Sequence, residues 1–135
     1  MAMTPTPVLV QTPTIGRANL TSPTALTTRT SIAGTTGLTQ LTPVSTNGKR
    51  LDAIRIMSKG TSLAGLLSVW LYDGTTSTLW DEIAISAITP STTAVAFKAE
   101  SLYNTYGVVL PPAHQLFVSV TVQQDLVVTA HGGDY

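Results

Sequence analysis

Apolar and polar residues alternate with a period of two along much of the chain, most clearly between residues 63 and 88. Two apolar runs there flank a short stretch of turn-forming residues, 73–77. In the first run Leu67, Val69 and Leu71 fall on one face, because successive side chains on a strand point to opposite faces of a sheet. The stretch therefore predicts an antiparallel hairpin in the middle of a sheet, with the other strands added around it.

Shorter alternating segments occupy the remainder of residues 25–135, and turns rich in Gly, Pro, Asn and Ser separate them at intervals of about 8–12 residues. In the segment 50–58, strict alternation places Leu51, Arg55 and Met57 on the face opposite Ile54 and Ile56. Regularly spaced short strands are typical of a β-sandwich or barrel. We therefore expect one all-β domain, an antiparallel β-sandwich of about eight strands.

Asn47-Gly48 is the strongest turn signal in the chain. Both positions of such a pair tolerate positive φ, which a two-residue hairpin turn requires. We therefore expect the segments on either side, 38–44 and 50–58, to form a hairpin.

Residues 1–24 differ from the remainder because four prolines interrupt them. Proline removes a backbone donor and favours extended conformations in the preceding residue, which argues against a helix or a central strand. The segment is then either a disordered tail or an extended arm that orders on a neighbouring subunit, up to ~80 Å away. Its apolar content favours the arm, and we expect the sandwich, residues 25–135, to fold without it. The candidate contact residues of the arm are Val8, Leu9, Val10, Ile15, Arg17 and Leu20.

Charged residues make up 10% of the chain against a typical ~25%, and Thr and Ser take their place. Residues 1–51 carry a net charge of +4 and residues 52–135 carry −4. This asymmetry suggests an N-terminal segment that meets an acidic partner. The absence of cysteine excludes disulfides and thiolate metal sites, and no apolar run approaches the ~20 residues of a membrane-spanning helix.

Candidate catalytic and metal-binding residues are few. His114 and His131 lie in different segments without metal-ligand spacing, so we expect surface or hydrogen-bonding roles for both. Asp81 and Glu82 are adjacent and would point to opposite faces of a strand, so they cannot act as a carboxylate pair. Asp73 begins a stretch that resembles the start of a calcium loop, but the later carboxylates are missing and a β-turn is expected. We therefore expect no enzyme activity, no cofactor and no metal.

Three aromatic residues on the central hairpin, Trp70, Tyr72 and Trp80, suggest two alternatives. They could form a platform for a sugar, or they could lie at an interface between subunits, where Trp and Tyr are enriched. Basic residues are isolated, without a series of stacking aromatic residues, so we expect no nucleic-acid partner.

Four stretches, NGKRLDAIRI, SVWLYDG followed by LWDEIAI, VVLPPAHQLFVSV and VVTAHGGDY, together resemble the head decoration (cement) proteins of tailed bacteriophages. The resemblance covers about residues 25–135. It implies a jelly-roll-like β-sandwich that trimerises on the outer surface of the virion and clamps neighbouring capsid subunits. It implies no catalytic residues.

The expected function is therefore that of a non-enzymatic capsid decoration protein, a homotrimer without membrane contact. Its arm would bind the major capsid protein, and Trp70, Tyr72 and Trp80 would lie at the subunit interface. The alternative is a receptor- or glycan-binding module of a phage head or tail fibre that uses the same aromatic residues. An enzyme such as a glycan hydrolase is a third possibility, and it would need carboxylates brought together from distant strands.

Overall fold

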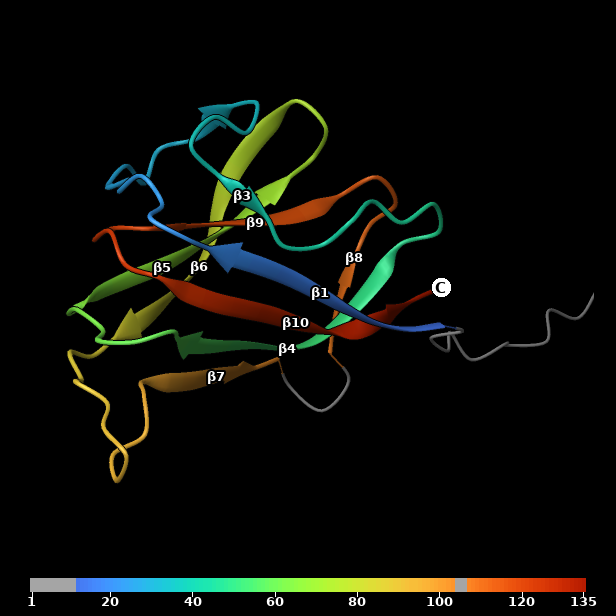
Figure 1. The fold of residues 1–135 in the computed structure, drawn as a ribbon. Helices are drawn as coiled ribbons and strands as arrows, with labels where there is room; N and C mark the ends of the chain where they lie inside the picture. Colours follow the sequence, from blue (N-terminus) through green and yellow to red (C-terminus); the bar gives the residue numbers. More distant parts are fainter. Residues whose placement is uncertain (1–11, 104–106) are drawn as a thin grey trace, which may run out of the picture.

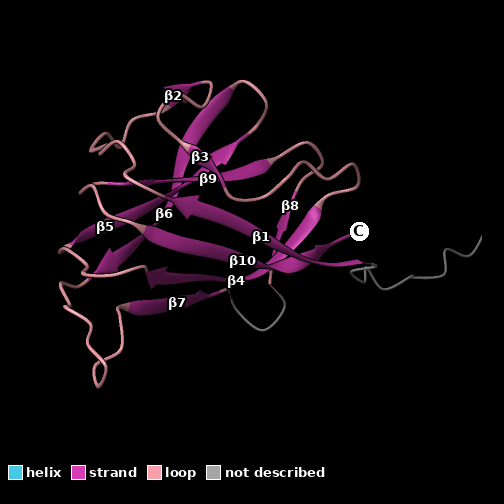
Figure 2. Ribbon diagram, viewed as in Figure 1, coloured by secondary structure: helices cyan, strands magenta, loops and turns pink. Residues whose placement is uncertain are grey.

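Two antiparallel sheets face each other in the computed structural model, which describes residues 12–103 and 107–135 (Figure 1). Sheet A runs in the order β1 (Thr12–Leu20), β10 (Leu126–Asp134), β4 (Lys49–Ser58) and β7 (Lys98–Leu102), and β8 (Val108–Leu110) pairs with the other half of β4. Sheet B runs in the order β2 (Ile32–Ala33), β6 (Thr76–Ile85), β5 (Gly65–Tyr72), β9 (Gln115–Val120) and β3 (Thr39–Gln40). These ranges contain strands and loops but no helix, as Figure 2 shows.

The pairing is nested around the central hairpin. Strand β5 pairs with β6, β4 with β7, β3 with β9 and β1 with β10, so the chain folds back on itself like one long antiparallel ribbon. This arrangement of eight strands in two sheets, with the first strand beside the last, is a jelly roll. Strands β2 and β8 are short additions to it. The structure confirms the all-β sandwich and the hairpin over 65–85, with β5 in the middle of sheet B.

The core lies between the inner faces of the two sheets. Aliphatic side chains from both sheets fill it, since alternate residues of each strand point inward. Burying each large side chain contributes ~1.5–3 kcal/mol, so the long strands supply most of the stabilisation. The fully buried members of this core include Leu20, Leu51, Ile54, Ile56, Leu67, Val69, Leu116, Val118, Val120, Leu126 and Val128.

The predicted boundary at residue 24 is wrong. Residues 12–20, which we assigned to a separable arm, form β1 and pair along their whole length with the last strand, β10. Ala18 and Leu20 on this strand are buried in the core. Pro13 is tolerated because β1 lies at the edge of sheet A, where a missing N–H donor costs little.

Two β-bulges change the faces that strict alternation predicts. Asp52 is an extra residue in β4, so Leu51 joins Ile54 on the buried face instead of opposing it. Trp80 is an extra residue in β6, so Trp80 and Asp81 both approach Tyr103, which follows β7. The Trp80 and Tyr103 rings lie 5.1 Å apart, and the Tyr103 hydroxyl donates to Asp81 Oδ2 at 2.8 Å. This contact closes one side of the sandwich between β6 and β7.

The hairpin predicted at Asn47-Gly48 does not form. Gly48 has a φ of +93° as expected for a turn, and the Ser45 hydroxyl donates to its carbonyl at 2.7 Å. However, β3 and β4 on either side belong to different sheets. The turn therefore carries the chain from sheet B to sheet A.

Candidate functional site

The predicted arm residues do not form one group. Val8, Leu9 and Val10 lie outside the described residues. Ile15 and Arg17 point outward from β1, whereas Leu20 is buried in the core and cannot contact a partner.

The predicted place of Trp70 on an exposed aromatic face is wrong. Trp70 has no exposed surface, and its indole Nε1 donates to the Ser119 hydroxyl at 2.9 Å. Tyr72 is half-buried, meets Phe117 edge-to-face at 5.5 Å and donates its hydroxyl to the Gly74 carbonyl. Trp80 is half-buried against the core. Trp70 therefore contacts neither a sugar nor a subunit, whereas a place for Tyr72 and Trp80 at a subunit interface stays a prediction.

The segment 21–42 explains why Trp70 is buried. It is hydrogen-bonded along sheet B, through Leu26 N to Val120 O, Gly34 N to Thr75 O and Leu41 N to Leu116 O. In Figure 1 this segment, which contains β2 and β3, loops over one end of sheet B. Trp70 and Ser119 lie on the face of sheet B that points away from the core between the sheets, so this segment covers a second, smaller buried layer.

Three of the four N-terminal cations pair with acids from the second part of the chain. Arg29 Nε lies 2.5 Å from Glu82 Oε1, Lys49 pairs with Asp134, and Arg50 Nε lies 2.9 Å from Asp52 Oδ1. The hydrogen bond from Arg29 holds the pKa of Glu82 below its usual range. Ion pairs within the fold therefore neutralise three of the four positive charges of residues 1–51, and Arg17 is the one that forms no ion pair among the described residues.

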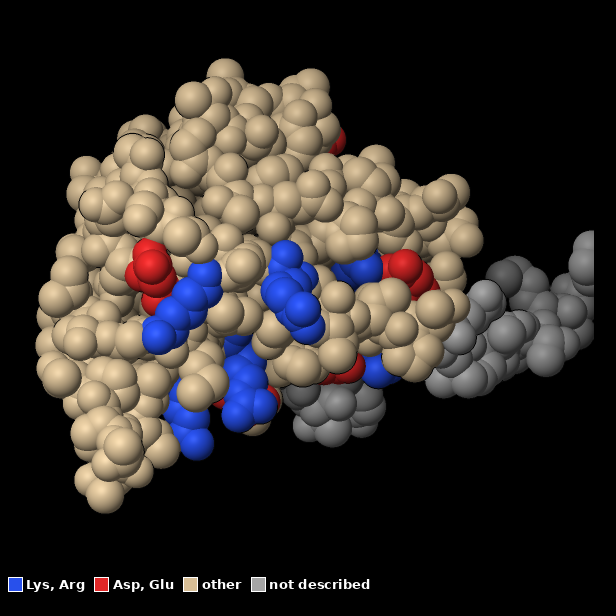
Figure 3. All heavy atoms as spheres, viewed as in Figure 1, with Lys and Arg blue, Asp and Glu red and all other residues tan. Residues whose placement is uncertain are grey.

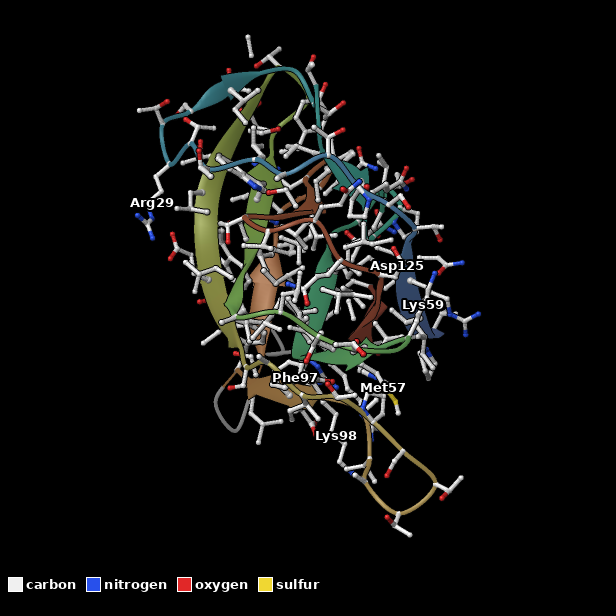
Figure 4. The ribbon with its side chains drawn as sticks, turned by 60° about the vertical axis from the view of Figure 1, so that its left-hand side comes forward. Arg29, Met57, Lys59, Phe97, Lys98 and Asp125 are labelled. Atoms are coloured by element: carbon white, nitrogen blue, oxygen red, sulfur yellow. The ribbon has the colours of Figure 1, made fainter. Side chains whose placement is uncertain are left out.

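The other four cations gather on the outer face of sheet A. They are Arg17 on β1, Arg55 on β4, Lys59 after β4 and Lys98 on β7. None of them lies within 4 Å of a carboxylate in the described part of the chain. Figure 3 shows several basic side chains on the face of the molecule that is turned toward the viewer, and Figure 4 shows Arg29 on the opposite side from Lys59.

The register of the strands arranges this face in three rows across sheet A, each with one residue from β1, β10, β4 and β7 in that order. We name them the methionine row, the arginine row and the apolar row. They are Asn19, Val127, Met57 and Lys98; Arg17, Thr129, Arg55 and Glu100; and Ile15, His131, Ala53 and Leu102.

Exposed apolar side chains lie among these cations. Ile15 is 63% exposed, Leu102 is 74% exposed, and Met57 is also exposed. A solvated face of an antiparallel sheet is normally polar. Exposed apolar groups beside charges are typical of protein interaction sites. The outer face of sheet A is therefore the candidate binding surface.

An open groove of about 600 Å³ crosses this surface. Strand β10 forms its floor with Val127, Thr129 and His131, and β1 and β4 form its walls. The floor is half-buried, and the Thr129 hydroxyl lies 3.2 Å from His131 Nε2. The remaining lining residues are Ile15, Arg17, Arg55, Met57, Ser58 and Lys59.

The residues that we considered as metal ligands or catalytic groups lie apart from one another in residues 12–103 and 107–135. They contain no group of three or more His, Cys, Asp or Glu that could hold a metal ion. Asp81 and Glu82 do point to opposite faces, since Asp81 bonds Tyr103 and Glu82 bonds Arg29. Burial and the hydrogen bond to Asp81 raise the pKa of the Tyr103 phenol, which keeps it protonated. His114 lies in the loop before β9, with Nδ1 3.1 Å from the Pro112 carbonyl.

Sequence reasoning missed Arg55, Met57, Lys59, Lys98 and Leu102 as surface residues of one site. Alternation did place Arg55 with Met57 on one face of their strand. Only the pairing of β4 with both β10 and β7 brings them beside Ile15 and Arg17.

No helix in the described part of the chain is long and apolar enough to cross a membrane. Comparison of the chain with family models, with characterised proteins and with solved structures finds no match.

Proposed function

We propose that this protein is a non-enzymatic decoration protein of a phage capsid, which binds the major capsid protein on the outer surface of the virion. The observation that carries the proposal is the outer face of sheet A, where four cations without carboxylate partners surround exposed apolar side chains. On a chain with so few charges, such a concentration favours docking onto an acidic protein surface.

The jelly roll supports this proposal by analogy at the level of the fold. Jelly rolls occur in viral capsid proteins, but also in lectins and cupins, so the fold alone does not decide between them. We expected a lectin-like role to use Trp70, Tyr72 and Trp80 as an aromatic platform, and the burial of Trp70 removes one of these three residues from it. No observation favours the glycan-binding alternative.

The proposed contact differs from the flexible arm expected from the sequence. Ile15 and Arg17 would reach the capsid from a paired strand whose position the rest of sheet A holds. A prepositioned surface loses less conformational entropy on binding than a tail that must order. A homotrimer on the shell remains part of the proposal, because repeated contacts of a symmetric assembly add to each other.

Binding to purified shells tests the proposal. We expect the protein to co-sediment with shells of its parent phage, and the double variant Arg17→Glu/Arg55→Glu to lose binding. Arg29→Gln is the matched control, because it removes a surface cation from the opposite side of the molecule. Cryo-EM of the parent virion then locates the protein. A particle that lacks it, or density for it in a tail fibre, would reject the assignment.

A further inference from the structure

The groove on sheet A is wide enough to hold one extended polypeptide. Its walls, β1 and β4, are both neighbours of the floor strand β10, so they lie about 10 Å apart. The walls carry long side chains, among them Arg17 and Arg55, whereas the floor between these two is Thr129. An extended segment lying along β10 would therefore pass between two guanidinium groups.

The spacing of the rows matches the repeat of such a segment. Successive rows are two residues apart along each strand, about 6.6–6.8 Å. Residues i and i+2 of an extended peptide are separated by the same distance and point to the same side. Three alternate side chains of the peptide would thus face the methionine, arginine and apolar rows in turn.

We infer that the groove binds an extended acidic segment of a partner protein with the pattern apolar-x-(Asp/Glu)-x-apolar. The central carboxylate accepts hydrogen bonds from Arg17 and Arg55, because guanidinium groups are suited to carboxylates. One flanking apolar residue lies on Val127 and Met57, and the other lies on Ile15. The two x residues point to solvent and are free to vary.

Other occupants fit the same surface less well. Residues 1–11 of this chain contain no acidic residue, and they offer nothing to the arginine pair. A second copy has few acids to offer, because three of the seven form ion pairs and three accept hydrogen bonds within the fold, which leaves Glu100. The ion-paired acids are Glu82, Asp134 and Asp52, and the acceptors are Asp73, Asp81 and Asp125. Single-stranded nucleic acid binds through aromatic stacking beside cations. The groove lining contains no Phe, Tyr or Trp.

This inference rests on the proposed function, since it describes how the same surface would recognise the capsid protein, but its test needs only the purified full chain. A synthetic peptide centred on Leu-Ser-Glu-Ser-Leu is titrated into the protein, and binding is followed by calorimetry and by amide chemical shifts. The matched control peptide has Lys in place of Glu. An oligothymidylate of similar length is titrated in parallel.

We expect saturable binding of the acidic peptide, with shift changes confined to β1, β10 and β4. Affinity should fall about tenfold or more for Arg17→Ser, for Arg55→Ser and for the Lys peptide, and remain unchanged for Arg29→Gln. Light scattering checks that each variant keeps its oligomeric state, and circular dichroism that it stays folded. Equal binding of both peptides, stronger binding of the oligonucleotide, or self-association that Arg17→Ser abolishes would overturn the inference. Failure of the peptide with normal shell binding would reject this recognition mode alone, whereas failure of shell binding would reject the proposed function.

Discussion

Lys49 at the start of β4 forms an ion pair with Asp134 at the end of β10, and the ammonium group also donates to Thr14 Oγ1 of β1 at 3.2 Å. Lys49 is only 4% exposed. Lys49 and Asp134 are direct register partners, and Thr14 lies on the next strand. The contacts of Lys49 therefore link β4, β10 and β1, and they join the first strand of the described chain to the last.

Removing one partner should therefore destabilise the fold. Asp134→Ala leaves the buried ammonium of Lys49 without its carboxylate, and we expect a loss of about 2–4 kcal/mol in the free energy of unfolding. Urea denaturation measures this loss. The double variant Lys49→Met/Asp134→Ala should recover part of it, because no uncompensated charge remains. A single variant as stable as the parent would contradict the role of the pair.

Trp70 should contribute to stability and not to recognition. Trp70→Ala removes a fully buried side chain, and we expect a loss of about 3–5 kcal/mol. Ser119→Ala leaves the buried indole N–H without its acceptor and should cost about 1–2 kcal/mol. Thermal unfolding compares the two variants. Rapid quenching of the Trp70 fluorescence by iodide, measured in a Trp80→Phe background, would contradict its burial under residues 21–42.

The turn of the central hairpin should respond to acid. Asp73 Oδ1 accepts hydrogen bonds from Thr76 N and from the amide and hydroxyl of Thr75, and these bonds lower the Asp73 pKa to about 2. Because the folded pKa lies below the unfolded value of about 3.9, this contribution is complete above pH 4 and disappears as the pH falls toward 2. Asp73→Asn should flatten this part of the stability profile. An NMR titration that gives Asp73 an ordinary pKa would disprove the interaction.

Gly132 should tolerate no side chain. It follows the register shift of β10, and a Cβ atom there would lie 1.8 Å from the Arg50 carbonyl oxygen. Backbone on both strands would have to move, so we expect Gly132→Ala to cost about 3 kcal/mol or to prevent folding. Gly60→Ala is the control, because a Cβ atom at Gly60 would meet nothing within 4 Å. Equal denaturation midpoints for the two variants would contradict this account.

Deletion of residues 1–24 should unfold or aggregate the protein. The deletion removes β1, takes Ala18 and Leu20 from the core and exposes the edge of β10. Soluble yield and circular dichroism measure the effect. Ile15→Ser changes only an exposed side chain of the same strand, and it should leave stability within about 0.5 kcal/mol of the parent. A well-folded truncated protein would restore the view that the whole segment is a separable arm.

The local sequence pattern was sufficient to predict features that depend on a single strand or a single turn. Alternation between 63 and 88 predicted the hairpin of β5 and β6, and the turn spacing predicted a sandwich of about eight strands. The adjacency of Asp81 and Glu82 predicted their separation onto two faces. Such features depend on the period of the strand and on the residues next to each other, which the sequence contains directly.

Long-range pairing determined the rest. The prolines of residues 1–24 hid an edge strand, because only β10, more than a hundred residues away, provides its hydrogen-bond partner. Bulges at Asp52 and Trp80 changed which side chains are buried, and they arise from the mismatch between paired strands. The basic groove exists only because the fold sets β1, β10 and β4 side by side. Arg29 and Lys49 are absent from it, and each pairs with an acid far away in the sequence. Sequence alone therefore determined the class of fold, and tertiary structure decided which residues face a partner.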